Sequence, residues 1–409
     1  MHFGQAYADE SLVSFGDAGR LAYRKDELGN RLPDFSHCGY GGANRSVPKV
    51  SSRVVVSPCN QDDTNRIQTA IDYVSQLPAD DGGHRGAVLL SGGKFNISGQ
   101  LRIHASGVIL RGFGAGEHGT TLRATGRDRR SLIRVLPPKR TEQPVLNKRT
   151  FSILDDYVPV GANSIRLNST EGLNVGAQVE VTHPSSKAWI DKLEIDRLGW
   201  REGTRDIRWL RTISRIDGSR IELDVPLTLA LEKAVGPATL QIVNDADRLQ
   251  EVGIEDLALV SDFDELNPKD EEHAWYGVHM QGVRDAWVRR VQFRHLAGGA
   301  VMLGDKTSRI TVSDCASSDP VSEIGGYRRH TFFTLGQQCL FLRCWAENGL
   351  HDFCVGHCTA GPNAFVNCYA KNALADSGPW ESCATGVLYD NVRIEGNDLN
   401  LINRWNSPP

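Results

Sequence analysis

The hydrophobic and polar residues between positions 288 and 392 follow a pattern that repeats. Five short runs are rich in β-branched and aromatic residues, and they end at Val291, Cys315, Cys344, Cys368 and Val392. The spacings between these end points are 24, 29, 24 and 24 residues. A period in the twenties, with Asn, Asp and Gly between the runs, is typical of a parallel β-solenoid in which each repeat is one coil. The pattern therefore predicts stacked coils over this region.

Three of the five end points are cysteines. If neighbouring coils lie about 4.8 Å apart, residues at the same offset stack directly above one another. Cys315, Cys344 and Cys368 are then predicted to form a ladder inside the solenoid. A disulfide would fit the distance, but side chains in a parallel ladder point the same way, and free cysteine behaves as a small core hydrophobe. A buried stack of free thiols is the favoured interpretation.

The first 145 residues predict an extended leader, a helix and the first coils. Residues 1–60 are punctuated by Gly and Pro and read as the leader. Asp62, Asp63 and Thr64 offer helix N-cap oxygens, apolar residues recur at helical spacing between Ile67 and Leu77, and Pro78 ends the helix. We expect the helix to cap the open first coil. Closely spaced strands follow at 87–90, 94–97, 101–103, 108–110 and 121–123, which completes a region assigned to residues 61–145.

Residues 146–245 interrupt this rhythm and predict a β-rich insertion. Asp217-Gly218 lies between two strand-like runs and is a hairpin signal. The insertion carries Trp189, Trp200 and Trp209 among charged residues, which indicates either a small separate core or platforms on which sugar rings stack. We favour the core for Trp209, and we take Trp189 and Trp200 as candidate substrate contacts.

The main coils are expected from residue 246 to residue 409. They resume at residues 252–257, and Val291 follows Leu257 after 34 residues. The extra length forms a loop on the flank of the solenoid, in which His273 and Trp275 are further candidate substrate contacts.

Composition and charge narrow the classes of function. The 409 residues are 40% hydrophobic and carry a net charge of −4, which argues against a nucleic acid partner. No apolar run approaches the roughly 18 residues that a membrane span needs, so no membrane partner is expected. Residues 1–19 lack a basic start followed by an apolar core, so no signal peptide is recognised in this chain. We expect a secreted or periplasmic protein, with a cytoplasmic one and the oligomeric state left open.

Several motifs resemble a known superfamily. The helix start 62–71, the Gly-rich first coils and the later coils are similar to right-handed parallel β-helix proteins of the pectate-lyase-like superfamily. The runs 320–330, 350–353, 361–365 and 376–379 resemble a group of uncharacterised bacterial β-helix proteins that are expected to act on polysaccharides. The resemblance implies a right-handed parallel β-helix and a polysaccharide or oligosaccharide partner. With the capping helix and the insertion predicted above, the expected fold class is all-β.

The spacing of the coils also predicts a wall of titratable residues, and the resemblance suggests its chemistry. Counting from the end points aligns Glu323, Asp352 and Asp376, whereas local motifs align His330 with His351 and with Glu381. A polysaccharide lyase needs a base and a cation to stabilise the carbanion that forms next to a carboxylate. The candidate catalytic residues are Arg328, Arg329, His330, His351, Asp352, Asp376 and Glu381, and the candidate contacts with substrate near the end of the chain are Trp380 and Arg404.

Three functions follow from this wall. In a lyase, which we place first, the cation is either an arginine or a Ca²⁺ ion held by Glu323, Asp352 and Asp376. A glycoside hydrolase or transglycosylase would instead use two carboxyl groups about 5 to 9.5 Å apart. A β-helix that binds a glycan without cleaving it is the third alternative.

Overall fold

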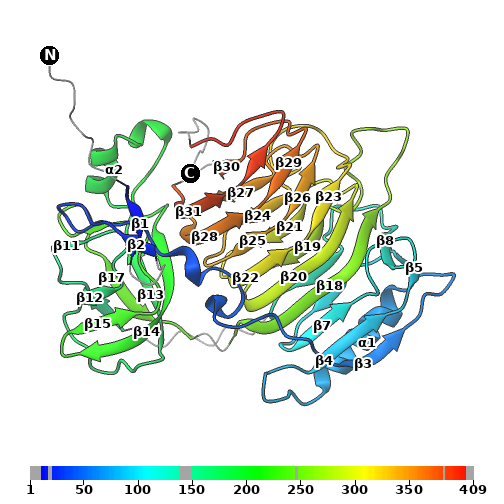
Figure 1. Cartoon of the computed structure of the whole chain (residues 1–409), viewed down its shortest axis with the longest axis horizontal. Coiled ribbons are helices and arrows are strands. Elements are labelled where there is room, and N and C mark those ends of the chain that lie inside the picture. The colour runs from blue at the N-terminus through cyan, green and yellow to red at the C-terminus, as the bar shows by residue number, and fades with distance from the viewer. Residues whose placement is uncertain (1–10, 17–20, 139–148, 245–246, 381–382, 402–409) are drawn as a thin grey trace. The chain divides into compact units, whose positions relative to one another are not determined.

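The computed structural model describes residues 11–16, 21–138, 149–244, 247–380 and 383–401. The chain divides into two compact units (Figure 1). Among the described residues, the smaller unit contains 11–16, 21–34 and 149–243, and the larger unit contains 35–138, 244, 247–380 and 383–401. Within the described residues, helices that are long and apolar enough to cross a membrane are absent.

The larger unit is a parallel β-helix. Each strand pairs in parallel with the corresponding strand of the next coil, so that Val288 is in register with Val312, then Phe341, Phe365 and Tyr389. This register reproduces the spacings of 24, 29, 24 and 24 residues that the sequence pattern predicts. Leu257 is likewise in register with Val291. The predicted fold class, an all-β right-handed parallel β-helix, is confirmed.

Two parallel sheets form the walls of the β-helix. The larger sheet contains a continuous path of strands with shorter strands beside it, and the smaller sheet contains seven strands, here called the seven-stranded sheet. The path of the larger sheet runs β3 (Ser52–Val56), β4 (Gly86–Leu90), β7 (Val108–Arg111), β18 (Leu249–Ser261), β20 (Val283–Arg294), β22 (Ser308–Ser313), β25 (Leu340–Leu342), β28 (Ala360–Val366) and β31 (Thr385–Asp390). Its side strands are β5 (Gly93–Ile97), β8 (Thr120–Ala124), β23 (Ala316–Ser318), β26 (Trp345–Glu347), β29 (Tyr369–Lys371) and β32 (Arg393–Ile394). The seven-stranded sheet runs β6 (Leu101–Ile103), β9 (Ile133–Val135), β19 (Tyr276–Met280), β21 (Gly299–Leu303), β24 (Phe332–Thr334), β27 (Phe353–Gly356) and β30 (Gly378–Trp380).

The predicted cysteine ladder lies in the core between these walls. Cys315, Cys344 and Cys368 are buried on successive coils and are free thiols. Each Sγ donates to a backbone carbonyl of the preceding coil, at 3.7, 3.5 and 3.5 Å respectively. The predicted ladder is therefore confirmed.

The predicted helix is α1 (Thr64–Gln76), which begins after Asp63 and ends before Leu77. The carboxylate of Asp62 accepts hydrogen bonds from the backbone and the hydroxyl of Thr64, which stabilises the first turn. The apolar face of α1 is buried in the same core as the first strands, through Ile67, Ala70, Ile71 and Val74. That α1 caps the first coil stays a prediction. The leader contains the hairpin β1 (Val13–Phe15) and β2 (Leu21–Tyr23) and short 3₁₀ turns at Phe35–His37 and Tyr40–Ala43.

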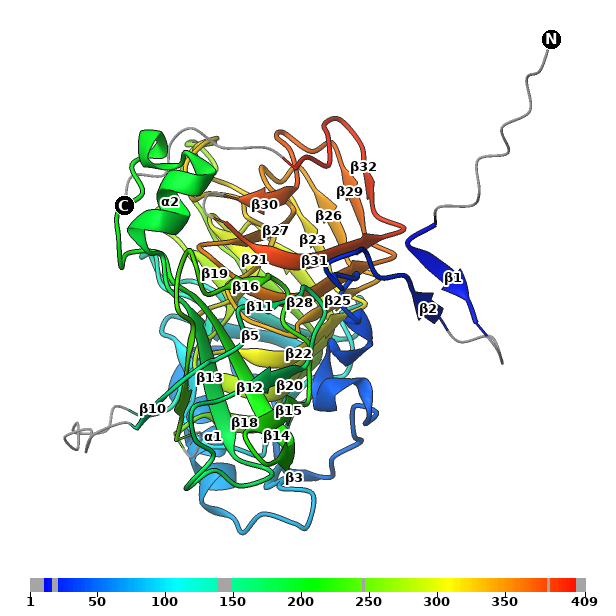
Figure 2. The same cartoon turned by 90° about the vertical axis from the view of Figure 1, so that its left-hand side faces the viewer.

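The smaller unit contains a six-stranded antiparallel sheet (Figure 2). The strand order is β10 (Thr150–Ser152), β17 (Thr239–Ile242), β13 (Gln178–His183), β14 (Ile207–Asp217), β15 (Arg220–Leu223) and β12 (Ser164–Arg166). A two-stranded ribbon of β11 (Tyr157–Val158) and β16 (Leu231–Glu232), the helix α2 (Lys187–Leu193) and a 3₁₀ turn at Asp196–Leu198 complete it. The hairpin expected at Asp217-Gly218 is confirmed, because Asp217 pairs with Arg220.

The tryptophans of the smaller unit are core residues. Trp189, Trp200 and Trp209 are 6%, 8% and 0% exposed. The rings of Trp189 and Trp200 pack edge to face with their centroids 5.7 Å apart. The prediction that Trp189 and Trp200 stack on sugar is wrong, because a stacking platform needs an exposed ring face and these rings bury theirs against each other.

Candidate functional site

Three basic side chains lie side by side on the outer face of the seven-stranded sheet. Arg102 on β6 is in register with Arg134 on β9, and Arg134 is in register with His279 on β19. The residues on either side of each one are fully buried: Leu101, Ile103, Ile133, Val135, Val278 and Met280. Because side chains alternate along a strand, the basic residues between these core residues must point outward.

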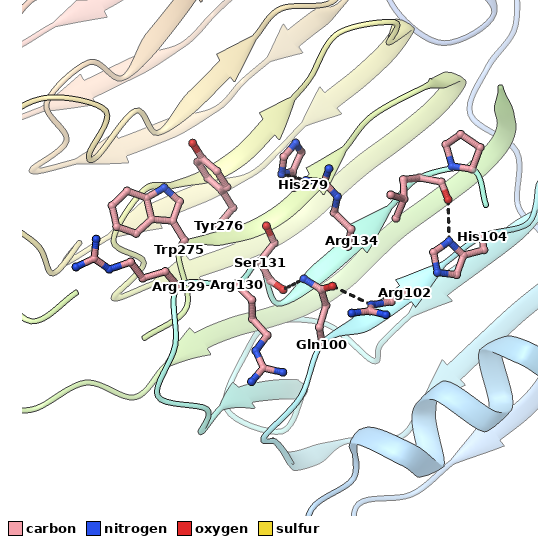
Figure 3. Close-up of a pocket in the computed structure, with 12 residues that line it drawn as sticks. Gln100, Arg102, His104, Arg129, Arg130, Ser131, Arg134, Trp275, Tyr276 and His279 are labelled. Carbon is pink, nitrogen blue, oxygen red and sulfur yellow. Dashed lines mark hydrogen bonds between the residues drawn. The ribbon is translucent and has the colours of Figure 1, made fainter. Parts of the chain in front are cut away.

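These residues line a cavity of about 550 Å³ (Figure 3). The other cationic or titratable side chains of its wall are His104, Arg129, Arg130 and Tyr276, and Trp275 adds an indole ring. No carboxylate is found in this wall among the described residues. We call this cavity the basic pocket.

Two of its four arginines lack a carboxylate partner. Arg130 pairs with Asp128, and Arg129 pairs with Glu271 at 3.2 Å and with Glu272 at 3.1 Å. Arg102 donates instead to the amide oxygen of Gln100 at 3.0 Å, and Arg134 to that of Gln281 at 2.7 Å. Within the described part of the chain, neither Arg102 nor Arg134 forms an ion pair, so the basic pocket carries positive charge that an anion could neutralise.

A neutral imidazole lies beside Arg134. The Nδ1 atom of His279 accepts a hydrogen bond from the Arg134 guanidinium. Burial and the neighbouring charge of Arg134 lower the pKa of His279 to about 3. Burial also raises the pKa of Tyr276, whose ring packs against His279 with the centroids 5.5 Å apart. The basic pocket therefore holds an unprotonated imidazole and a protonated phenol at neutral pH.

Trp275 forms one wall of the basic pocket. The Arg129 guanidinium lies over its ring, 5.6 Å from the centroid. The indole also packs on the backbone of Gly298, where a β-carbon would lie 2.2 Å from Trp275 Nε1. The absence of a side chain at Gly298 is what allows this position of the ring. The structure therefore places the predicted contact Trp275 in the wall of a pocket.

His273, predicted together with Trp275, does not reach that surface. It is fully buried, and Nε2 donates to the carbonyls of Asp270 and Val321 at 3.1 and 3.0 Å. The Nδ1 atom is hydrogen-bonded to the Ser261 hydroxyl at 3.1 Å. Burial lowers the pKa of His273. The prediction that His273 contacts substrate is wrong, since both ring nitrogens already hold loops of the protein together.

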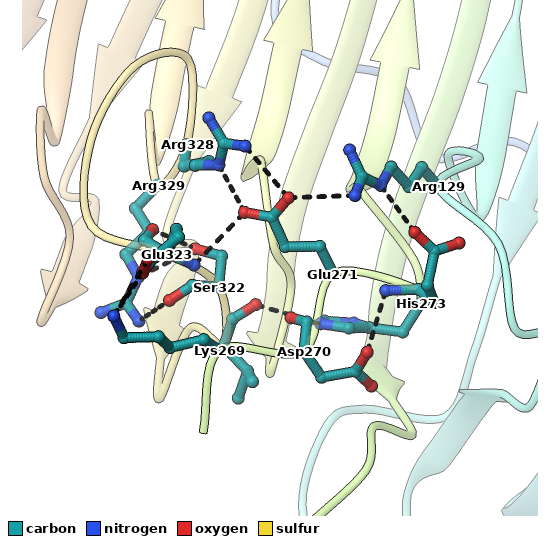
Figure 4. Close-up of polar contacts among 11 residues, drawn as sticks. Arg129, Lys269, Asp270, Glu271, His273, Ser322, Glu323, Arg328 and Arg329 are labelled. Carbon is teal, nitrogen blue, oxygen red and sulfur yellow. Dashed lines mark hydrogen bonds and ion pairs between the residues drawn. The ribbon is translucent and has the colours of Figure 1, made fainter. Parts of the chain in front are cut away.

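The predicted catalytic arginines belong to a network of ion pairs and hydrogen bonds that involves two loops (Figure 4). Arg328 pairs with Glu271, and the Arg328 guanidinium lowers the pKa of that carboxyl. Arg329 is buried and donates to the hydroxyl and the carbonyl of Ser322 at 3.1 and 2.8 Å. Arg328 thus fixes the loop around residues 319–330 against the loop around residues 262–275, whereas Arg329 closes its own loop through Ser322. Arg129 reaches the same network through Glu271, which links it to the basic pocket.

The expected calcium ligands do not come together. Among the residues that the structure describes, no three His, Cys, Asp or Glu side chains form a group that could hold a metal ion. Glu323 is paired with Lys269 at 2.8 Å. Asp352 and Asp376 do occupy one register, since Cys354 pairs with Gly378, but the longer coil before them moves Glu323 out of it. The predicted site for Ca²⁺ is therefore not formed.

Asp352 is completely buried, which separates it from any substrate. Its Oδ1 accepts a hydrogen bond of 2.5 Å from the Thr331 hydroxyl, and its Oδ2 has no partner. Burial raises the pKa of Asp352 to about 7. Asp352 therefore packs inside the wall of the β-helix and does not contact a glycan.

The predicted histidines do come together. The local alignment of His330 with His351 is confirmed by the pairing of Phe332 with Phe353, and their ring centroids are 5.0 Å apart. The ring of Trp380 lies 4.7 Å from His330 and 5.8 Å from His351. His351 Nδ1 donates to the carbonyl of Asp376 at 2.6 Å. Two further predicted residues, Glu381 and Arg404, lie outside the described residues.

The sequence did carry a signal for the basic pocket. Leu101-Arg102-Ile103, Ile133-Arg134-Val135 and Val278-His279-Met280 each place one basic residue between two core residues. The register between them could not be read, because Arg134 and His279 are 145 residues apart across the insertion. Only the folded sheet brings them together.

Comparison with known proteins gives likeness at the level of the fold. No protein-family model and no curated protein matches the sequence. Among solved structures, the tailspike protein gp49 from Pseudomonas phage LKA1 is 15% identical, with a TM-score of 0.48 over 81% of this chain and 52% of that one. The gp54 tailspike of Acinetobacter baumannii bacteriophage AP22, solved with a capsular saccharide, is 9% identical, with a TM-score of 0.32 over 83% of this chain and 67% of that one. The polygalacturonase from Erwinia carotovora is 13% identical, with a TM-score of 0.32 over 88% and 83%.

The fold and the site together define the structural class of this protein. This chain is a right-handed parallel β-helix protein with a basic pocket on its seven-stranded sheet. It spans about half the length of the LKA1 tailspike.

Proposed function

We propose that this protein is a carbohydrate-active enzyme that binds an acidic polysaccharide in the basic pocket and cleaves it by β-elimination. The observation that carries the proposal is the pair Arg102 and Arg134, which lie on adjacent strands without an ion pair to a carboxylate in the described chain. The two arginines start from backbone positions about one strand spacing, roughly 4.8 Å, apart, so both guanidinium groups can turn toward a single uronate carboxylate.

The pocket supplies the groups that elimination requires. The arginines stabilise the negative charge that builds up on the uronate when the proton next to its carboxylate leaves. His279 accepts that proton at Nδ1, its unprotonated nitrogen, once the Arg134 guanidinium has turned from Nδ1 to the uronate carboxylate. Tyr276, kept protonated by burial, donates a proton to the departing glycosidic oxygen. A carbon–hydrogen and a carbon–oxygen bond break, and the products are an unsaturated uronide and an alcohol.

Substrate binding would also activate His279. In the free protein, burial and the cation of Arg134 hold its pKa near 3, where an imidazole is a weak base. A carboxylate bound to Arg134 offsets that positive charge and raises the pKa of His279 toward its usual range. The base thus gains strength when the substrate is in place.

Hydrolysis fits these residues less well than elimination. A glycoside hydrolase needs two carboxyl groups that reach the sugar. The described wall of the basic pocket has none, and Asp352 is fully buried. We therefore place the lyase first, and no step of it requires a metal ion.

The proposal is tested by incubating the full chain with a panel of uronate-containing and neutral glycans. Ultraviolet absorbance detects unsaturated products, and a reducing-end assay detects any cleavage. We expect both signals on an acidic glycan, and we expect Arg134→Gln to lower kcat/KM by roughly 100- to 1000-fold. Arg343→Gln, which removes an exposed arginine paired with Asp314 on the larger sheet, is the matched control. New reducing ends without absorbance, or full activity in Arg102→Gln and Arg134→Gln, would contradict the proposal.

A further inference from the structure

A second cluster lies at the other end of the seven-stranded sheet. Tyr327 is 46% exposed, and its ring stacks on that of the exposed His357 with the planes 8° apart. Trp380, the last residue of β30, packs edge to face against Tyr327 at 4.6 Å between centroids. The His330 ring lies beneath this group, 5.8 Å from Tyr327 and 4.7 Å from Trp380. We call Tyr327, His357 and Trp380 the aromatic surface.

The register places Trp380 on the same face of the sheet as the basic pocket. Pro379 is in register with the fully buried Val355. Following the register from strand to strand, the same row of core-facing positions contains Met280 and Val135. Trp380 comes one residue after Pro379, and Leu136 comes one residue after Val135. Leu136 lines the basic pocket, so Trp380 lies on the same side of the sheet. From β9, which carries Arg134, to β30 there are five inter-strand steps, or about 24 Å. Between them, the coil of β21 presents Met302 and Gly304 on this face, and β24 presents Phe333, which is in register with Met302 and is only 3% exposed.

The two ends of this face differ in charge. Among the described residues, two arginines of the basic pocket form no ion pair, whereas the two arginines that follow Tyr327 in the chain are bound to other residues. Arg328 is paired with Glu271, and the buried Arg329 is bound to Ser322. An exposed aromatic group without a free arginine favours the apolar C–H face of a pyranose ring over an anionic substituent.

We propose that the aromatic surface binds an uncharged sugar of the same polysaccharide whose acidic sugar occupies the basic pocket. This inference rests on the proposed function and adds a substrate class to it. The substrate is a heteropolymer with acidic and uncharged sugars about 24 Å apart along the chain, and not a uniformly acidic polymer.

The first test measures binding of neutral sugars by calorimetry and does not depend on cleavage. The probes are the hexasaccharides of cellulose, mannan, xylan and starch, titrated into the full chain. We expect at least one of these hexasaccharides to bind. Trp380→Ala and Tyr327→Ala should each weaken its affinity about 2- to 12-fold, and Arg134→Gln should leave that affinity unchanged. Tyr73→Ala, which removes an exposed ring on α1, is the control. Absence of binding by all four, or equal binding by wild type and both aromatic variants, would overturn the inference.

The second test uses fragments of hyaluronan, which alternate acidic and uncharged sugars, and fragments of polygalacturonate, which are uniformly acidic. We expect Trp380→Ala to weaken the binding of long hyaluronan fragments about 2- to 12-fold. The binding of disaccharides and of polygalacturonate fragments should stay unchanged. An equal loss on long polygalacturonate fragments would overturn the preference for uncharged sugars. Neutral binding at Trp380 with no acidic fragment bound at Arg134 would instead refute the proposed function and support the aromatic surface.

Discussion

Replacing Asp352 with asparagine should change how the stability of the β-helix depends on pH. The side chain is fully buried, its Oδ2 has no partner, and burial raises its pKa from 3.8 to about 7. Between these values the unfolded chain has lost the Asp352 proton and the folded chain has kept it. Stability contributed by the protonated form is therefore present below about pH 4 and is lost as the pH rises toward 7.

The size of this effect follows from the two pKa values. The interval from 3.8 to about 7 corresponds to roughly 4 kcal/mol of unfolding free energy. Asparagine has a similar shape, and its oxygen can still accept from the Thr331 hydroxyl, but it has no proton to lose. We expect wild type to lose roughly 4 kcal/mol relative to Asp352→Asn between about pH 4 and pH 8, so that the variant is the more stable protein at the higher pH.

Urea unfolding at about pH 4, 6 and 8, followed by tryptophan fluorescence and circular dichroism, measures this difference. Asp390→Asn, at an exposed position of β31, controls for the loss of an acid elsewhere in the same unit. A free-energy difference between wild type and Asp352→Asn that is the same at all three pH values would refute the reasoning. It would mean that the Asp352 carboxyl is solvated or paired in the folded state.

Three further predictions follow from other residues. If a bound uronate raises the pKa of His279, the acidic limb of kcat, which reports the complex, should lie at higher pH than that of kcat/KM, and coincident limbs would contradict this. Gly298→Ala should displace the ring of Trp275 and raise KM for the acidic glycan with little change in the melting temperature, as steady-state kinetics and calorimetry would show. Trp200→Ala should destabilise the smaller unit by roughly 3 to 5 kcal/mol without changing glycan affinity in the material that stays folded, and lost affinity there would restore its role as a contact.

Much of the fold could be predicted from the sequence because it depends on short-range patterns of residues. The coil period, the cysteine ladder, the apolar face of α1 and the hairpin after Asp217 each depend on residues close together in the chain. Alternation along a strand fixes which side chains face the core, and stacking of equal coils carries that choice to the next coil. The alignment of His330 with His351 was readable for the same reason.

The candidate site was decided by the tertiary structure. The sequence pattern indicated Arg328, Glu323 and His273 as site residues, but each is bound to a residue of another loop. These contacts could not be predicted, because the loops differ in length and their relative register is not set by the sequence pattern. Conversely, Arg102 and Arg134 looked like ordinary surface residues of short strands until the sheet placed them beside each other without a carboxylate. Alternation within a strand is set by local geometry, whereas the neighbours of a side chain across coils depend on how many residues each loop inserts, and only the folded chain resolves that.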